Sequence, residues 1–267
     1  MGPYRLVERV EATEWIDVVA DPVQGVVDTV IPRGPWKDLL SGTWLGHPLH
    51  PLLIAGPIGF WTSATLLDLL GGKKSRKAAT RLVGLGVVSA LPTAAAGASD
   101  WADTTGAAKR VGLLHALCNY GAVAIFLGSW RARRKGRHYR GVLLTLVGDG
   151  LLGASGYLGG HLSYSRGVGV DSTVFDPGPT EWTPLEDTDT PILVTDQGAL
   201  HAVCTHRGGP LDQGKIDGGC VECPWHGSRF NLADGSIEQG PATQPEPAFD
   251  VRTVGGRTEV RRAVPSP

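Results

Sequence analysis

The sequence predicts two parts, a membrane all-α bundle of four helices and, after it, a small all-β domain. The 267-residue chain divides near residue 165 into an apolar half and a polar half, which the mean hydropathy of −0.03 conceals. Four long apolar stretches fill the first half, whereas short segments of strand-like composition, separated by turns, fill most of the second.

The four apolar stretches are each about 17 to 21 residues long, the length that crosses about 30 Å of hydrocarbon. They are Pro51–Leu70, Leu82–Ala98, Val111–Trp130 and Val142–Leu162. The alternative is a soluble bundle of buried helices, but such helices normally show a polar stripe that these mostly lack. In the last stretch the pairs Gly150/Ala154 and Gly156/Gly160 have a spacing that favours close helix–helix approach.

Basic residues are concentrated in two of the three connecting loops. Residues 73–81 contain five and residues 131–140 contain six, whereas the loop between them has only Lys109 and Arg110. The positive-inside rule then predicts a multi-pass membrane protein with both termini and the C-terminal domain on the outer face. A net charge of −1 provides no basic field for nucleic acid, so the lipid bilayer is the first expected partner.

The remaining segments complete the expected organisation. Residues 1–44 form an N-terminal amphipathic segment, in which valines among acidic residues predict one or two surface helices against the membrane or the bundle. The bundle then spans 45–165, a linker rich in glycine and proline spans 166–185, and the all-β domain spans 186–267.

The most specific motif is "CTHRGGPLDQGKIDGGCVECPWHGSRF" in the C-terminal domain. Cys204 and His206 are separated by sixteen residues from a second pair, Cys223 and His226. Two cysteines and two histidines suit a structural zinc ion. They also suit a [2Fe–2S] cluster in which one iron has two thiolates and the other has two imidazoles. Spacing alone leaves both open, but the flanking glycines and prolines, with "QGPA" at 239–242, predict three loops that meet over a cluster.

The sequences "CTHRGGPL" and "CPWHGSRF" resemble the Rieske iron–sulfur domain over about residues 180–263. The resemblance implies that Cys204 and Cys223 bind the buried iron, and that His206 and His226 bind the outer iron and remain exposed to partners. Three further residues are expected beside the cluster: Ser228, Phe230 and Pro241. His201 lies outside the motif and is expected on a strand surface, and Cys220 is expected to take no part.

The departures from this family point to its ferredoxin-type branch. Rieske subunits of cytochrome bc complexes carry one extra cysteine in each loop, joined as a disulfide, but the matching positions here are Gly209 and Trp225. Those subunits also have a tyrosine that bonds a cysteine sulfur, where this chain has Phe230. Fewer hydrogen bonds to sulfur predict a lower reduction potential. Because no large domain with a two-histidine, one-carboxylate iron site follows residue 263, the sequence does not predict an oxygenase catalytic subunit.

Four histidines lie toward the outer side of the predicted bundle: His47, His50, His115 and His161. They are either interfacial polar residues or a site for haem b, a metal ion or a quinone. Asp149, in the middle of the last apolar stretch, is either functional or a neutral carboxyl bonded to Asn119. "GHPLHPLL" (46–53), "ASDWAD" and "GGHLSYSRGVGVD" resemble the bacterial membrane family called domain of unknown function 2231, over about residues 20–172.

The sequence therefore predicts a membrane-anchored electron-transfer protein, an electron carrier or oxidoreductase component. It would relay single electrons through a Rieske [2Fe–2S] cluster, from quinol or a bundle-bound haem to a redox partner protein. The alternative is a redox-sensing or assembly protein whose cluster reports oxidation state without turnover.

Overall fold

The computed structural model describes residues 2–263, and the chain divides into two compact units. The first, helical unit comprises residues 1–30 and 49–168, and the second, β-rich unit comprises residues 31–48 and 169–267. The sequence had suggested one N-terminal segment over 1–44. The structure instead divides this segment after Val30 and assigns residues 31–48 to the β-rich unit.

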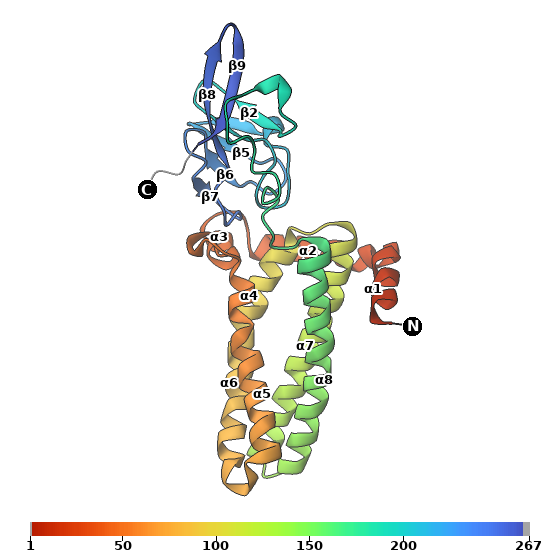
Figure 1. Ribbon diagram of the computed structural model, residues 1–267. Helices are drawn as coiled ribbons and strands as arrows, with labels where there is room; N and C mark the ends of the chain where they lie inside the picture. The colour runs from red at the N-terminus through yellow and green to blue at the C-terminus, as the bar shows by residue number, and fades with distance from the viewer. Residues whose placement is uncertain (1, 264–267) are drawn as a thin grey trace. The chain divides into compact units, whose positions relative to one another are not determined.

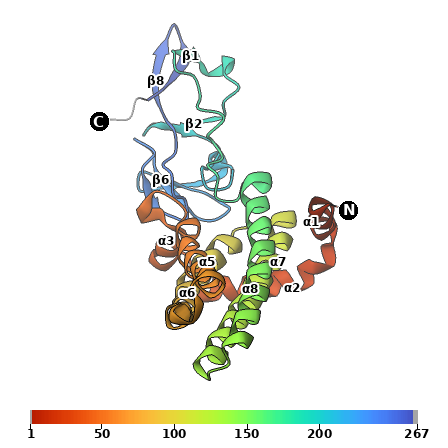
Figure 2. The ribbon, with the colours of Figure 1, turned by 60° about the horizontal axis from the view of Figure 1, so that its bottom comes forward.

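The helical unit contains four long helical spans that are apolar enough to cross a membrane (Figure 1). The first is α4 (Leu49–Leu53) continued by α5 (Ala55–Leu70), and the others are α6 (Gly72–Ala102), α7 (Gly106–Arg134) and α8 (His138–Arg166). The helices are longer than the predicted apolar stretches, because the basic residues of the loops continue the helices at their polar ends. Figure 2 shows α5 beside α6 and α7 beside α8, the two closest pairs of the bundle.

Glycines admit large aromatic side chains into the bundle interior. Trp61 and Phe126 are stacked with ring centroids 3.9 Å apart, and a Cβ at Gly86 or Gly148 would overlap one of these rings. The predicted role of Gly150 and Gly156 is wrong, because no heavy atom lies within 4 Å of a Cβ built at either position. Small residues at helix-packing spacing therefore did not identify which face of α8 packs.

A buried ion pair lies near one end of the bundle. Arg133 donates to both carboxylate oxygens of Asp68, at 2.9 and 2.5 Å, and both side chains are about 2% exposed or less. The hydroxyls of Ser129 and Thr145 accept further bonds from the same guanidinium. Arg133, which the sequence assigned to a basic loop, is thus part of the bundle interior.

Two N-terminal helices, α1 (Pro3–Ala12) and α2 (Asp17–Val30), pack against the other helices of this unit. Arg110 donates to Asp17, and Gln24 donates to the carbonyls of Trp101 and Thr104 at the end of α6. The bonds from Gln24 thus attach α2 to carbonyls at and just beyond the C-terminal end of α6.

The β-rich unit contains two antiparallel sheets (Figure 1). One has the order β1-β9-β8-β3-β2, from Thr183–Pro184, Arg257–Arg262, Ala248–Val254, Ala199–His201 and Ile192–Val194. The other has the order β4-β5-β6-β7, from Lys215–Asp217, Cys220–Glu222, Arg229–Asn231 and Ile237–Gln239. Residues 31–48 add the short helix α3 (Pro35–Ser41) and a 3₁₀ turn over Thr43–Leu45.

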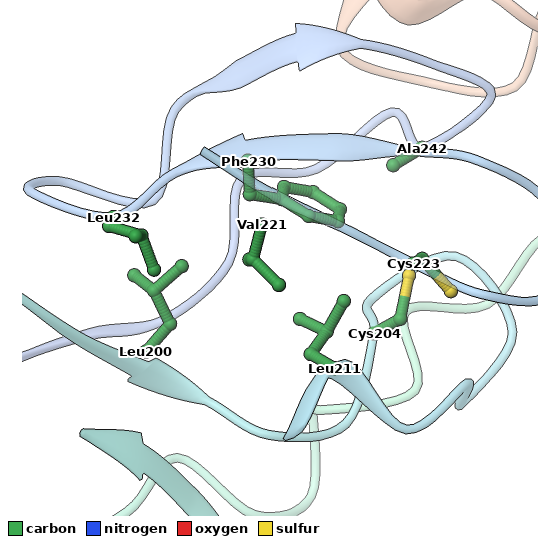
Figure 3. Close-up of a cluster of buried hydrophobic side chains, with 8 residues drawn as sticks. All are labelled: Leu200, Cys204, Leu211, Val221, Cys223, Phe230, Leu232 and Ala242. Carbon is green, nitrogen blue, oxygen red and sulfur yellow. The ribbon is translucent and has the colours of Figure 1, made fainter. Parts of the chain in front are cut away.

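The second sheet is a meander, and its hydrophobic residues form one compact core with residues of β3 and the loops (Figure 3). The eight buried members are Leu200, Cys204, Leu211, Val221, Cys223, Phe230, Leu232 and Ala242. Gly218 and Gly219 connect β4 to β5 with positive φ angles of 60° and 80°, as a two-residue type I′ hairpin turn requires. Two cysteines of the motif therefore lie at one end of a well-packed core (Figure 3).

Candidate metal centre

Two loops with the same backbone hydrogen bonds carry the four motif residues. In the first loop, which follows β3, the N–H of Cys204 donates to the carbonyl of Gly209, and Gly208 donates to the carbonyl of Cys204, both at 2.8 Å. In the second loop, between β5 and β6, Cys223 donates to Ser228 at 2.8 Å, and Gly227 donates to Cys223 at 3.0 Å. Each loop thus turns back five residues after its cysteine.

A glycine with positive φ makes each turn possible. Gly208 has a φ of 72° and Gly227 a φ of 79°, a backbone conformation that side chains with a Cβ rarely adopt. The spacing of glycine to cysteine in the two motifs is therefore a requirement of loop geometry. It places Cys204 and Cys223 at equivalent positions of the two loops, with His206 two residues after the first cysteine and His226 three residues after the second.

The four side chains lie as two pairs of like donors. The thiols of Cys204 and Cys223 are within hydrogen-bonding reach of each other, and Figure 3 shows them side by side. The rings of His206 and His226 have centroids 5.1 Å apart and are nearly perpendicular, at 88°. Among residues 2–263 no three His, Cys, Asp or Glu side chains converge on a single point. A pair of thiols and a separate pair of imidazoles is the donor set that a two-iron cluster of mixed ligation needs.

Backbone amides point at the sulfur atoms. The N–H of His206 donates to Cys204, and the N–H groups of Trp225 and His226 donate to Cys223. Such bonds stabilise negative charge on sulfur, and a thiolate is the form that binds metal. The residues present therefore fit an anionic iron–sulfur cluster.

The pKa values of the four groups follow from burial and from each other. The hydrogen bond from Cys204 lowers the pKa of Cys223 to about 6, with support from backbone N–H groups and from Arg33, and raises that of Cys204. Burial lowers the pKa of His226 to about 4, and burial together with the nearby charges of His226, Arg207 and Lys37 lowers that of His206. Both imidazoles are therefore neutral near pH 7, as metal ligation requires.

A third loop, around Pro241, closes over the second one. The N–H of Ala242 donates to Ser228 Oγ at 3.0 Å, and Gln239 Nε2 donates to the carbonyl of Gly227 at 3.2 Å. Phe230 is fully buried in the core of Figure 3, and Pro241 is buried as well. The structure thus places Ser228, Phe230 and Pro241 around the loop that carries Cys223.

Gly209 and Trp225, the two positions where cytochrome bc subunits have their extra cysteines, lie against each other. A Cβ built on Gly209 would be 3.2 Å from the indole ring of Trp225 and 2.7 Å from Cys223 Sγ. Close packing of an indole on a glycine joins the two loops here, without a covalent link.

Residues 31–48 pack on these loops, and the sequence gave no indication of this contact. Arg33 donates to the carbonyl of Trp225 at 3.0 Å, and Asp38 accepts a hydrogen bond from the N–H of Gly240. Lys37 is 3% exposed, and its charge lowers the pKa of both imidazoles. His206 and His226 are accordingly only partly exposed.

Glu246 is a second residue that the sequence gave no reason to select. Its side chain is 2% exposed, and its Oε1 accepts a hydrogen bond of 2.5 Å from the N–H of Thr205, between Cys204 and His206. Burial raises its pKa to about 8.

The expectation that His201 lies on a strand surface is wrong. That residue is 2% exposed and lies 3.4 Å from Asp176, because the chain after the helical unit folds back over β3.

Within the helical unit the structure brings together two of the four candidate histidines. His50 and His115 have ring centroids 6.4 Å apart, and each Nδ1 lies 2.9 Å from a backbone carbonyl, of Thr93 and Ser155 respectively. His161 lies elsewhere in the unit and is bonded to Glu11 at 2.7 Å. His47 belongs to the β-rich unit.

Two polar residues of the bundle have partners that differ from the expected ones. Asp149 accepts a bond of 2.6 Å from Thr65, not from Asn119. Asn119 instead donates to Nε2 of His115 at 3.0 Å.

Comparison with protein families identifies the two parts of the chain in sequence order. A model described as "Predicted membrane protein (DUF2231)" matches residues 46–172, and a model of the Rieske [2Fe-2S] domain matches residues 175–255. The chain thus contains a segment that matches the DUF2231 model and, after it, one that matches the Rieske domain, in the order that the sequence predicted.

Similar proteins match over short stretches. Apoptosis-inducing factor 3 of Mus musculus is 37% identical over 73 residues, covering 26% of this chain and 12% of that protein. The anthranilate 1,2-dioxygenase ferredoxin subunit of Burkholderia cepacia is 36% identical over 62 residues, 23% of this chain and 57% of the subunit. The cytochrome b6-f complex iron-sulfur subunit of Gloeobacter violaceus is 44% identical over 63 residues, 21% of this chain and 32% of the subunit. The chain thus spans about an eighth to just over half the length of these relatives. The Rieske domain and these relatives support iron–sulfur electron transfer.

Proposed function

We propose that the chain is a membrane-anchored electron-transfer protein in which Cys204 and Cys223 hold one iron of a [2Fe–2S] cluster, and His206 and His226 hold the other. The observation that carries the proposal is the shared backbone geometry of the two loops, which bring their donors together in like pairs. It pairs thiol with thiol and imidazole with imidazole. A cluster bound there supplies a one-electron couple.

The chain's own residues determine how such a cluster behaves. The amides of His206, Trp225 and His226 stabilise charge on sulfur, and the buried core excludes water from the thiolate side. Phe230 offers no hydroxyl to a sulfur, and Gly209 and Trp225 form no disulfide between the loops. These features favour a potential below that of the cytochrome bc type, in the ferredoxin-type range.

The ligand assignment is tested by exchanging one outer ligand. His226→Cys replaces an imidazole with a thiolate, so the cluster should remain but its reduction potential should fall and its EPR spectrum should change. His201→Gln is the control, a buried histidine of the same unit that lies outside the loops. An H226C protein with the potential and spectrum of the unaltered chain would remove His226 from the ligand set.

A more specific proposal is that the electron donor binds at the His50–His115 pair in the bundle. Since a carbonyl only accepts, each ring donates from Nδ1 and keeps the lone pair on Nε2. Nε2 of His115 accepts a bond from Asn119, so a ligand at this ring would take the place of that bond. The pair would hold haem b, a metal ion or the head of a quinol. A pyridine haemochrome spectrum and reduction of the cluster by a short-chain quinol separate these cases. Loss of the haemochrome spectrum or of quinol-driven cluster reduction in His115→Ala, but not in His161→Ala, would support the pair as the binding site.

The proposed sidedness places the Rieske domain on the outer face of a bacterial cell membrane, as the basic loops indicate. Reporter fusions after residues 77 and 135 should be cytoplasmic, and a fusion after residue 267 should be outside. The opposite result would move the cluster to the cytoplasm.

A redox-sensing or assembly role is the alternative function. It would be favoured by a protein partner that binds only one oxidation state, with no turnover by any donor.

A further inference from the structure

Residues 31–48 contact the second and third loops of the candidate metal centre. Arg33 lies beside Gly227 and donates to the carbonyl of Trp225, in the second loop. Asp38 and Thr43 lie at Gly240, in the third loop, and Gln244 donates to the carbonyl of Gly46. This segment therefore covers the edge of the centre where the two histidines lie.

On its inner side, the segment places two cationic side chains, Lys37 and Arg33, near that edge. Lys37 is 3% exposed, and its charge acts on both His206 and His226. Arg33 acts on Cys223 and His226 in the same sense. Residues 31–48 are thus part of the structure that encloses the centre.

The outer side of the same segment is apolar and exposed. Trp36 and Leu39, three residues apart on α3, have exposed fractions of 69% and 45%, and Trp44 has 63%. The indole N–H of Trp44 donates to the carbonyl of Leu39 at 3.2 Å, so the three side chains belong to one surface. We name this surface, Trp36, Leu39 and Trp44, the tryptophan face. Two exposed indoles and a leucine are unusual for a surface in water, but they are typical of the membrane–water interface.

Covalent connectivity indicates what covers the tryptophan face. Trp44 precedes the first apolar helical span, Leu49–Leu70, by five residues, a stretch of chain that reaches at most about 18 Å. Pro48, which leads into that span, is next to Gly169, which follows the last one, since a Cβ on Gly169 would be 3.5 Å from its ring. Both chain connections to the apolar helices therefore leave the β-rich unit at one place, close in sequence to the tryptophan face.

We propose that the tryptophan face lies in the headgroup region of the lipid bilayer, so that the histidine edge beneath it faces the membrane surface. A redox partner that reaches the cluster over this edge would then be lipid-borne or membrane-embedded. The lipid contact is independent of the proposed function, whereas the consequence for the redox partner rests on it.

The test uses the full chain in nanodiscs of phosphatidylethanolamine and phosphatidylglycerol. A benzophenone amino acid replaces Trp36 or Trp44, and mass spectrometry detects lipid adducts after irradiation. Leu52, exposed within the first apolar span, is the positive control. Val254, exposed at the end of the β8–β9 hairpin, is the negative control. Lipid adducts at 36, 44 and 52 but not at 254 are expected.

Adducts at 52 without any at 36 and 44 would overturn the proposal, as would adducts at 36 and 44 that contain only protein. A second measurement leaves the chain unaltered and follows the spin relaxation of the reduced cluster in nanodiscs with headgroup-labelled nitroxide lipid. Faster relaxation than in unlabelled nanodiscs is expected, and equal relaxation would overturn the membrane-facing edge. An absent cluster would refute the proposed function but leave the cross-linking result to decide the lipid contact.

Discussion

Gly209→Ala adds one methyl group at the contact between the two ligand loops. Gly209 does not have a positive φ, so alanine is compatible with its backbone and the effect is steric. The new Cβ would lie 2.7 Å from Cys223 Sγ, whereas ordinary contact begins at 3.4 Å, so the sulfur must retreat by about 0.7 Å. Metal–ligand distances tolerate only about 0.2 Å. Strain of about 1–3 kcal/mol, typical of overpacking, corresponds to roughly 5- to 150-fold weaker cluster binding.

Iron, acid-labile sulfide and the reduced EPR spectrum of purified G209A protein measure this effect. We expect substoichiometric iron and an altered or absent signal. Gly25→Ala is the control, since no heavy atom lies within 4 Å of a Cβ at that position in α2. A G209A protein with full iron and sulfide and unchanged g-values would show that Gly209 does not adjoin Cys223 in the loaded protein.

Three further predictions concern buried polar groups and the core. Because burial raises the pKa of Glu246 to about 8, the folded state favours its protonated form, and stability should fall as pH rises from about 4.5 through about 8, by roughly 1.4 kcal/mol per pH unit. Glu246→Gln should remove that part of the pH dependence of the melting temperature; an unchanged profile would refute it. Arg133→Met should cost about 3–5 kcal/mol in thermal or denaturant unfolding by leaving Asp68 buried and unpaired, and adding Asp68→Asn should restore much of the loss; a double variant no more stable than R133M would contradict the pairing. Phe230→Tyr should raise the reduction potential by about 40 mV if its hydroxyl bonds a cluster sulfur with about 1 kcal/mol; redox titration with no shift would show that the hydroxyl does not reach sulfur.

The parts of the fold that the sequence predicted are those fixed by local pattern. Continuous apolar stretches identified the four spans, but not their ends, since hydropathy marks only the part of a helix that is apolar. Spacing and loop residues identified the two Cys–His pairs, because the turn at each cysteine needs the glycine four residues later, Gly208 or Gly227.

What the sequence did not predict depends on contacts between distant segments. Lys37 and Arg33 come near the histidines only because residues 31–48 pack with a unit that resumes at residue 169. Glu246 stands between two prolines, with no local sign that the N–H of Thr205 would be its partner. In the bundle, His50 and His115 are 65 residues apart, and Asp149 bonds to Thr65 on another helix.

The central claim is that two cysteines and two histidines share a [2Fe–2S] cluster. Pulsed EPR of the reduced, purified chain after labelling its histidines with ¹⁵N tests this directly. The account predicts a rhombic spectrum of low average g-value with couplings to two histidine nitrogens, one of which is lost in His226→Cys. Zinc without iron at Cys204 and Cys223, or a cluster with no histidine coupling, would contradict it.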